Sequence, residues 1–201
     1  MKDKVKQSYK RSSSIYDDLI THRKWWSKLY IRLFWNGVDD NEIAREMLRR
    51  IPDDFSGELL DVPVGTAVFT YEKYKAMKGA KITCLDYSAD MLDQAKARFS
   101  ENGIANVAAL QGDVGRLPFK DGAFDIVLSM NGFHVFPEKE KAWAEIFRVL
   151  KPGGRLIASF YIRGQSKVSD ALVKAVLAKK RLVRPALRDG FIVEETPFRN
   201  L

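Results

Sequence analysis

Short apolar runs alternate with segments of helical periodicity along the chain from residue 58 onward. Five runs, at 59–62, 81–85, 107–110, 124–130 and 155–161, are almost continuously apolar, as expected of strands that are covered on both faces. Helical patterns lie before and between them, at about 39–51, 67–78, 88–102 and 138–150. This alternation predicts an α/β domain with a doubly wound, mostly parallel sheet and helices on both faces.

Local signals support these boundaries. Ser88 is placed to cap the helix at 88–102, and Pro137 fits the first turn of the helix at 138–150. The run Lys151-Pro-Gly-Gly ends that helix and turns into the fifth strand. Right-handed crossovers require the strand order to reverse beside the first strand, and ligands of such sheets bind at this switch point, beyond the carboxyl ends of the strands.

The two ends of the chain carry most of its net charge of +8. Residues 1–35 contain nine Lys and Arg against three Asp and Glu, and residues 163–201 contain nine against four. A helical pattern at 16–35 is crowded with aromatic side chains, which include Tyr16, Trp25, Trp26 and Tyr30. We expect residues 1–38 to form an aromatic and basic helical lid over the strand ends, and residues 39–201 to form the main domain.

Composition excludes several classes of protein. A single cysteine, Cys84, leaves no internal disulfide and no cysteine-built zinc site, and we expect no metal. No apolar run approaches the roughly 20 residues that span a membrane, and the first ten residues are polar and lysine-rich, unlike a signal peptide. We therefore expect a cytoplasmic protein in which Cys84 is a buried, inert thiol.

The first strand ends in a tight turn whose residues exclude one common ligand class. A dinucleotide site has three glycines around a pyrophosphate, whereas this turn has only Gly65. Pro63 also removes a backbone donor that a phosphate would use. A cationic ligand without phosphate tolerates that loss and gains from nearby carboxylates.

Three carboxylates lie where such a ligand needs them. Asp61 and Asp86 end the first and second strands, and Asp113 follows the third. The carboxyl ends of these strands face one crevice, and the spacing of Asp86 from Asp61 suits a ribose diol. The sequence therefore predicts a site for a positively charged nucleoside.

The segments 59–66, 84–97, 110–119 and 124–154 resemble the ordered motifs of class I S-adenosylmethionine-dependent methyltransferases. The most specific parts are Leu117-Pro-Phe, Phe124-Asp-Ile-Val and Phe147-Arg-Val-Leu-Lys-Pro-Gly-Gly, which resemble the branch containing the ubiquinone/menaquinone biosynthesis C-methyltransferases. The resemblance covers about residues 40–162. It implies a Rossmann-like fold, S-adenosyl-L-methionine as cofactor and methyl transfer to a small-molecule acceptor.

The resemblance also implies roles for individual residues. Asp61 lies near the ammonium of the cofactor, Asp86 accepts hydrogen bonds from both ribose hydroxyls, and Asp113 meets the adenine amino group. The full set of cofactor-binding residues that it implies is Asp61, Val62, Pro63, Gly65, Thr66, Asp86, Tyr87, Met91, Gly112, Asp113, Val114, Ser129, Met130 and Asn131.

Two features depart from the family pattern. The family usually has glycine where this chain has Pro63 and Ala67, which predicts a stiffer loop and puts cofactor affinity in question. The family sheet commonly continues through two more strands beyond the fifth, the last of them antiparallel. Here residues 191–196 supply a sixth strand and no seventh follows, so we expect a domain truncated at its C-terminal strands, with an exposed edge.

Methyl transfer from a sulfonium is an in-line displacement, so the protein mainly aligns the nucleophile with the methyl group and excludes water. His134, after the fourth strand, is the best-placed general base for an acidic acceptor, and the alternative is a structural or solvent-facing histidine. The candidate substrate contacts are His134 together with Tyr16, Trp25, Trp26 and Tyr30 of the lid. They suit an aromatic, quinone-like or anionic acceptor.

The sequence also allows other interpretations of the N-terminal segment and of the function. The aromatic and basic N-terminal segment also suits a cover for the sheet, a homodimer contact or a peripheral contact with an anionic membrane. A pI near 9.5 suits a nucleic-acid binder or an RNA-directed methyltransferase. Against this, residues 129–134 lack the Asn/Asp-Pro-Pro-aromatic run common in enzymes that methylate base amino groups. A noncatalytic protein that keeps the fold is a further alternative.

Overall fold

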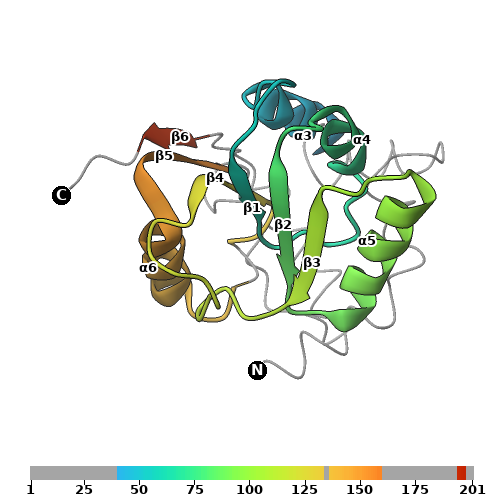
Figure 1. Cartoon of the computed structure of the whole chain (residues 1–201). Helices are drawn as coiled ribbons and strands as arrows, with labels where there is room; N and C mark the ends of the chain where they lie inside the picture. Colours follow the sequence, from blue (N-terminus) through green and yellow to red (C-terminus); the bar gives the residue numbers. More distant parts are fainter. Residues whose placement is uncertain (1–39, 134–135, 160–193, 198–201) are drawn as a thin grey trace, which may run out of the picture.

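The computed structural model describes residues 40–133 and 136–159 and the backbone of 194–197 (Figure 1). Its strands are β1 (Glu58–Asp61), β2 (Lys81–Asp86), β3 (Val107–Gln111), β4 (Phe124–Met130), β5 (Leu150–Ser159) and β6 (Glu194–Pro197). Its helices are α3 (Asp40–Arg49), α4 (Tyr71–Ala76), α5 (Ala89–Glu101) and α6 (Lys139–Val149). Four of the five strands predicted from apolar runs lie within one residue of their predicted bounds. The fifth was predicted at 155–161 but begins at Leu150, so the Lys151-Pro-Gly-Gly run, predicted as the turn before it, lies within β5.

The strands form one sheet in the order β3-β2-β1-β4-β5-β6, in which the first five are parallel. β1 pairs on one side with β2 and on the other with β4, so the strand order reverses at β1 as predicted. The carboxyl ends of β1 and β2 therefore lie beside each other, with Asp61 opposite Cys84 in the register. This arrangement opens a crevice at the switch point, where ligands of doubly wound sheets bind.

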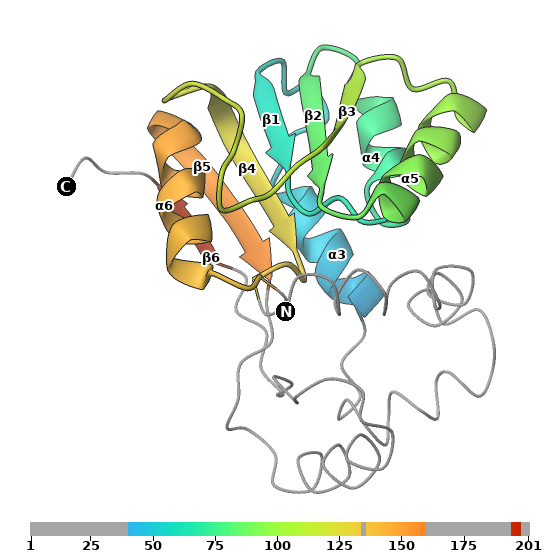
Figure 2. The ribbon, with the colours of Figure 1, turned by 90° about the horizontal axis from the view of Figure 1, so that it is seen from below.

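Helices cover both faces of the sheet, as predicted (Figure 2). Successive side chains of a strand point to opposite faces, so Leu59 and Leu60 enter different hydrophobic clusters. Leu59 packs with residues of α3, α4 and α5, and Leu60 packs with residues of α6. Both leucines are fully buried, which explains why these strands are continuously apolar in sequence.

Of the two predicted helix-start residues, Ser88 and Pro137, the structure confirms one and contradicts the other. Ser88 caps α5 as predicted, because its Oγ accepts a hydrogen bond from the Met91 amide at 3.4 Å. The prediction that Pro137 begins the next helix is wrong, because Glu138 is the N-cap residue of α6 and Pro137 lies before it. Pro137 instead lines the pocket in the crevice, next to Phe136.

The connection between β3 and β4, residues 112–123, contains no helix. Three of its backbone groups are hydrogen-bonded by two side chains of α6. Glu145 accepts from the Leu117 amide at 2.7 Å, and Arg148 donates to the carbonyls of Leu117 at 3.1 Å and Phe119 at 2.8 Å. Buried backbone groups need partners, and these bonds join the Leu117-Pro-Phe run to the Phe147-Arg-Val-Leu run in this structure.

The last strand corrects the prediction for the end of the sheet. The sequence predicted a sixth strand at 191–196 and no seventh, and it did not predict the direction of the sixth. In the structure, β6 begins at Glu194 and pairs antiparallel with β5, with Ala158 opposite Glu194. A run this short carries no periodicity that fixes the direction of pairing.

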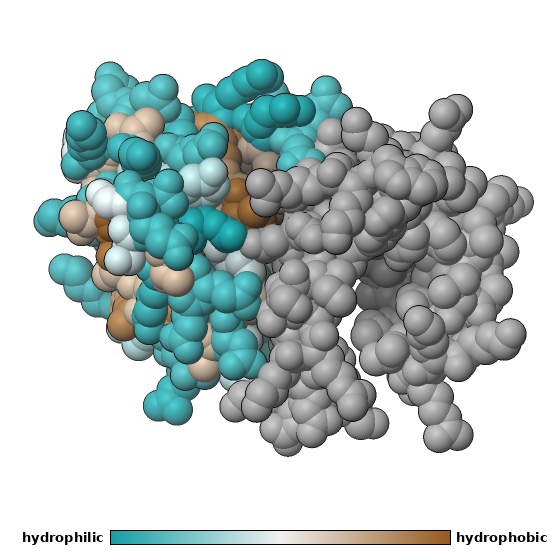
Figure 3. Space-filling view, turned by 90° about the vertical axis from the view of Figure 1, so that its right-hand side faces the viewer, coloured by the Kyte–Doolittle hydropathy of each residue, from teal (hydrophilic) through white to brown (hydrophobic). Residues whose placement is uncertain are grey.

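No helix among the described residues is long and apolar enough to cross a membrane. On the face shown in Figure 3, the described surface is largely hydrophilic, with apolar side chains visible in a few places. The two strongly exposed large apolar residues of the described part are Tyr87 and Leu110, which lie near the carboxyl ends of β2 and β3. Of these two residues, Tyr87 lines the pocket described below and Leu110 does not.

Candidate functional site

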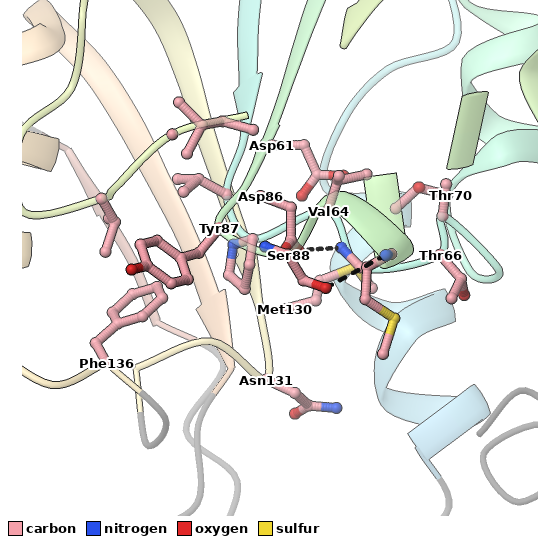
Figure 4. Close-up of a pocket in the computed structure, with 18 of the residues that line it drawn as sticks. Asp61, Val64, Thr66, Thr70, Asp86, Tyr87, Ser88, Met130, Asn131 and Phe136 are labelled. Atoms are coloured by element: carbon pink, nitrogen blue, oxygen red, sulfur yellow. Dashed lines mark hydrogen bonds between the residues drawn. The ribbon is translucent and has the colours of Figure 1, made fainter. Parts of the chain in front are cut away.

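A pocket lies at the carboxyl ends of the parallel strands, at the switch point (Figure 4). All but one of the residues predicted to bind a cofactor line it: Asp61, Val62, Pro63, Gly65, Thr66, Asp86, Tyr87, Met91, Gly112, Asp113, Val114, Met130 and Asn131. The exception is Ser129, which is fully buried and does not line the pocket. Side chains alternate along β4, so Met130 faces the crevice and its neighbour Ser129 does not.

Asp86, at the end of β2, is held by backbone donors. The amides of Gly65 and Ser88 donate to its two carboxylate oxygens, each at 2.8 Å. Burial raises the pKa of Asp86 above its ordinary value, although the amides of Ser88, Gly65 and Tyr87 favour the ionised form. These bonds fix both carboxylate oxygens of Asp86 in the pocket.

Asp61, at the end of β1, is the most deeply buried acid of the site, with 1% of its surface exposed. Its Oδ2 accepts a hydrogen bond of 2.7 Å from the hydroxyl of Tyr74, a buried residue of α4. Burial raises the pKa of Asp61 to about 7, the Tyr74 hydrogen bond opposes this rise, and the charge of Asp86 adds to it. Asp61 is therefore a carboxyl group that a cationic ligand can ionise near neutral pH.

Asp113 completes the predicted set of carboxylates, because it lines the same pocket. Its Oδ1 accepts from the Gly115 amide at 2.9 Å, which fixes the turn after β3. Val114 follows in this turn, lines the pocket and is buried. The three acids predicted to converge at one rim of the sheet therefore do so.

The turn after β1 is longer than predicted. A helix was predicted from residue 67, whereas α4 begins at Tyr71. Residues 64–70 instead bend around the pocket, with Gly65 at φ +57° and Ala67 at φ +56°. Ala67 therefore adopts a left-handed conformation that favours glycine, and it stands where the family usually has glycine.

Sequence reasoning missed several lining residues. They are Val64, Ala67, Val68, Phe69, Thr70, Leu85, Ser88, Phe136 and Pro137. Residues 68–70 were missed because periodicity assigned them to a helix. The glycine turn at Gly65 was the one feature of the sequence that indicated a longer loop there. Phe136 and Pro137 reach the crevice by tertiary packing, which no local pattern of the sequence reveals.

Pro63, after β1, packs closely against Gly132, after the neighbouring strand β4. A Cβ atom at Gly132 would lie 2.4 Å from Cδ of Pro63 and 2.7 Å from Oγ of Ser129. Because the proline ring is rigid, it cannot move away as a flexible side chain would. Gly132 is thus the residue that accommodates proline where the family usually has glycine.

We expect Gly132→Ala to lower the free energy of unfolding by about 1–3 kcal/mol, the usual cost of overpacking. Urea denaturation measures this change. Gly115→Ala is the matched control, because its added Cβ would meet nothing closer than 3.4 Å. Adding Pro63→Gly should recover part of the loss, because the 2.7 Å contact with Oγ of Ser129 would remain. Equal destabilisation by Gly132→Ala with and without Pro63→Gly would show that the alanine methyl group does not press on the proline ring.

Several predicted residues lie outside the described residues. They are His134, the predicted general base, and the lid residues Tyr16, Trp25, Trp26 and Tyr30. Their roles stay predictions. Among the described residues, no group of three His, Cys, Asp or Glu side chains is arranged to hold a metal ion.

A doubly wound sheet with buried acids at its switch point defines a nucleoside-binding domain. Residues 59–154 match the family model described as a methyltransferase domain. The demethylmenaquinone methyltransferase of Lactococcus lactis is 37% identical over 111 residues, which are 55% of this chain and 44% of that protein. The one of Lactiplantibacillus plantarum is 31% identical over 157 residues, 77% of this chain and 58% of that protein.

A solved structure shares the fold. Phosphoethanolamine N-methyltransferase 2 of Haemonchus contortus, in complex with S-adenosyl-L-methionine, is 23% identical with a TM-score of 0.61, over 74% of this chain and 34% of that chain. The chain belongs to the class I S-adenosylmethionine-dependent methyltransferases, as the sequence motifs predicted. The methyl donor of this family is S-adenosyl-L-methionine. The chain spans about half the length of the curated relatives described above.

Proposed function

We propose that this chain binds S-adenosylmethionine in the pocket and transfers its methyl group to a small-molecule acceptor. The observation that carries the proposal is the pair Asp61 and Asp86, two buried carboxylates from adjacent strands that line one pocket. Buried carboxylates are costly unless donors compensate them. A ligand with an ammonium group and a ribose diol supplies such donors.

The residues present fit this cofactor. Asp86 presents two fixed oxygens, which suit the two hydroxyls of a ribose. Asp61 suits the ammonium of the methionine part, because Tyr74 occupies only one of its acceptor positions. Met91 and Val114 offer buried apolar surface for adenine, and the turn at Asp113 offers polar groups at its edge.

Bound S-adenosylmethionine supplies a methyl group on a positively charged sulfur, which is already activated for attack. The remaining task of the chain is to align an acceptor and exclude water. Phe136 and Pro137 add apolar surface to the pocket wall, and Phe136 is itself buried. His134, two residues before Phe136 in the sequence, is our proposed general base.

The names of the relatives favour a quinone-like aromatic acceptor, and both are demethylmenaquinone methyltransferases. We propose an acceptor of this class, covered by the N-terminal lid, and a cytoplasmic location. A transfer assay with methyl-labelled cofactor over quinols, phenols, amines, thiols and RNA tests the proposed acceptor class. Transfer to RNA alone would favour the nucleic-acid alternative, and cofactor binding without any transfer would favour a noncatalytic role.

Asp86→Asn is the direct test of the cofactor site. Each hydrogen bond to a charged group contributes about 1.5–3 kcal/mol, so we expect the affinity for S-adenosylmethionine to fall by at least about tenfold. Calorimetric titration measures it. Asp90→Asn is the matched control, because Asp90 is an exposed acid of the first turn of α5. An unchanged affinity in Asp86→Asn would remove the ribose role from Asp86.

A further inference from the structure

Tyr74 connects the hydrophobic core to the proposed cofactor site. Its ring is fully buried among residues of α4, α5 and the sheet, 6.3 Å from the ring of Phe99. Its hydroxyl donates to Oδ2 of Asp61 at 2.7 Å. Tyr74 does not itself line the pocket, so it reaches a ligand only through Asp61.

The titratable groups that face Asp61 come from α4 and β2. The hydroxyl of Tyr74 approaches from α4, the thiol of Cys84 lies opposite on β2, and Asp86 stands at the end of β2. The pKa values of the Tyr74 hydroxyl and the Cys84 thiol are both raised well above their ordinary range by burial, so both groups stay neutral. The charged neighbour that acts on Asp61 is another acid, which disfavours a second negative charge.

We propose that Tyr74 is a positioning residue that orients Asp61 toward the methionine part of the cofactor, and that Asp61 releases a proton to solvent when the cofactor ammonium binds. This inference rests on the proposed function and adds to it a dependence of cofactor affinity on pH. The proton is the only atom that moves, from the Asp61 carboxyl group to the buffer. The resulting carboxylate then faces the ammonium and the Tyr74 hydroxyl.

The direction of the pH dependence follows from the geometry. Below neutral pH the buried carboxyl group is protonated and must lose its proton before it can pair with an ammonium, so the affinity rises with pH. Burial raises the pKa of Asp61 to about 7, and well below that value the affinity should change by about tenfold per pH unit. Above about pH 8 the α-amino group of a free ligand loses its own proton, so the affinity should fall again.

Tyr74→Phe tests the role of the hydroxyl. Its removal takes away the one hydrogen bond that favours ionised Asp61, so the rising part of the affinity profile should shift to higher pH. We expect the affinity to fall several-fold at pH 6.5 and to approach that of the unmodified protein at pH 8. A purely structural role would lower the affinity by the same factor at every pH.

Tyr71→Phe is the matched control. It makes the same chemical change on the same helix, but the Tyr71 hydroxyl bonds to Glu72 at 3.0 Å and not to Asp61. Its affinity profile should match that of the unmodified protein. Thermal unfolding of each variant, without ligand, shows whether it is folded before binding is measured.

The measurement is calorimetric titration of the full chain with S-adenosylmethionine between pH 5.5 and 8.5, in buffers of different ionisation enthalpy. Near pH 7 we expect release of about half a proton per cofactor bound, since the pKa of Asp61 is about 7. The second ligand is 5′-methylthioadenosine, which has the nucleoside but no ammonium. Its binding should release no proton and should not follow the same profile.

The outcomes separate this inference from the proposed function. Binding of both ligands with the same pH profile and no proton release would overturn the inference and leave the cofactor site intact. Failure of S-adenosylmethionine to bind at any pH would overturn the proposed function itself. If Tyr74→Phe is unfolded, proton release by the unmodified protein still tests whether Asp61 ionises on binding, and equal release with both ligands, or none with either, would overturn the inference.

Discussion

Asp61→Asn is expected to stabilise the free protein at neutral and alkaline pH and to remove most of its affinity for S-adenosylmethionine. Burial raises the pKa of Asp61 from 3.8 to about 7, so the folded state holds this proton more tightly than the unfolded state does. As the pH rises from about 4 to 7, the unfolded chain loses the proton first, and the contribution of Asp61 to stability decreases. The decrease is about 4 kcal/mol at most, at 1.36 kcal/mol per pKa unit.

Asparagine has no proton to lose, and its side-chain oxygen can still accept from the Tyr74 hydroxyl. The free energy of unfolding of Asp61→Asn, relative to the unmodified protein, should therefore increase between pH 4.5 and pH 8. Denaturant unfolding at these two values measures the change. A difference that does not depend on pH would show that Asp61 titrates at its ordinary value.

Asp125→Asn is a control with the opposite sign. Asp125 accepts from the Glu58 amide at 2.9 Å and from Lys151 at 2.7 Å, and these bonds lower its pKa despite its partial burial. Its contribution to stability is present at neutral pH and is lost as the pH falls through the lowered value. Asp125→Asn should therefore destabilise the protein at neutral pH, and cofactor affinity should be unchanged because Asp125 lies outside the pocket.

Arg148→Lys is expected to lower the free energy of unfolding by about 2–4 kcal/mol, although it keeps the charge. The guanidinium of Arg148 donates to both oxygens of Glu145, to Asp121 and to the carbonyls of Leu117 and Phe119, at 2.8–3.1 Å. A lysine ammonium has three donors and no planar fork, so some of these acceptors lose their partner. The connection between β3 and β4 contains no helix, so it depends on these bonds.

Arg49→Lys is the matched control for this prediction. Arg49 also pairs with a glutamate three residues earlier on a helix, Glu46 at 3.8 Å, but both side chains are largely exposed. Exposed pairs contribute about 0–1 kcal/mol, so the free energy of unfolding should change little. Equal effects of the two substitutions in urea denaturation would show that the stability of the connection between β3 and β4 does not depend on Arg148.

The sequence by itself determined the parallel part of the sheet. Apolar runs such as 124–130 predicted a buried parallel strand at its observed bounds, because a strand covered on both faces must be apolar along its whole length. Crossover handedness then required the order to reverse at β1, which brought Asp61, Asp86 and Asp113 to one rim without any knowledge of packing. The positions of these acids could be predicted because each lies at or just after the end of a strand, and strand ends are visible in the local sequence.

Only the tertiary structure decided the surroundings of these acids. Three contacts join residues that are not neighbours in the sequence. They are the hydrogen bond between Tyr74 and Asp61, the contact of Pro63 with Gly132, and the bonds from Arg148 to the connection between β3 and β4. Periodicity reports whether a side chain is buried, and it does not report which partner the side chain meets. The raised pKa of Asp61 depends on burial and on those partners, so it arises only when the chain is folded.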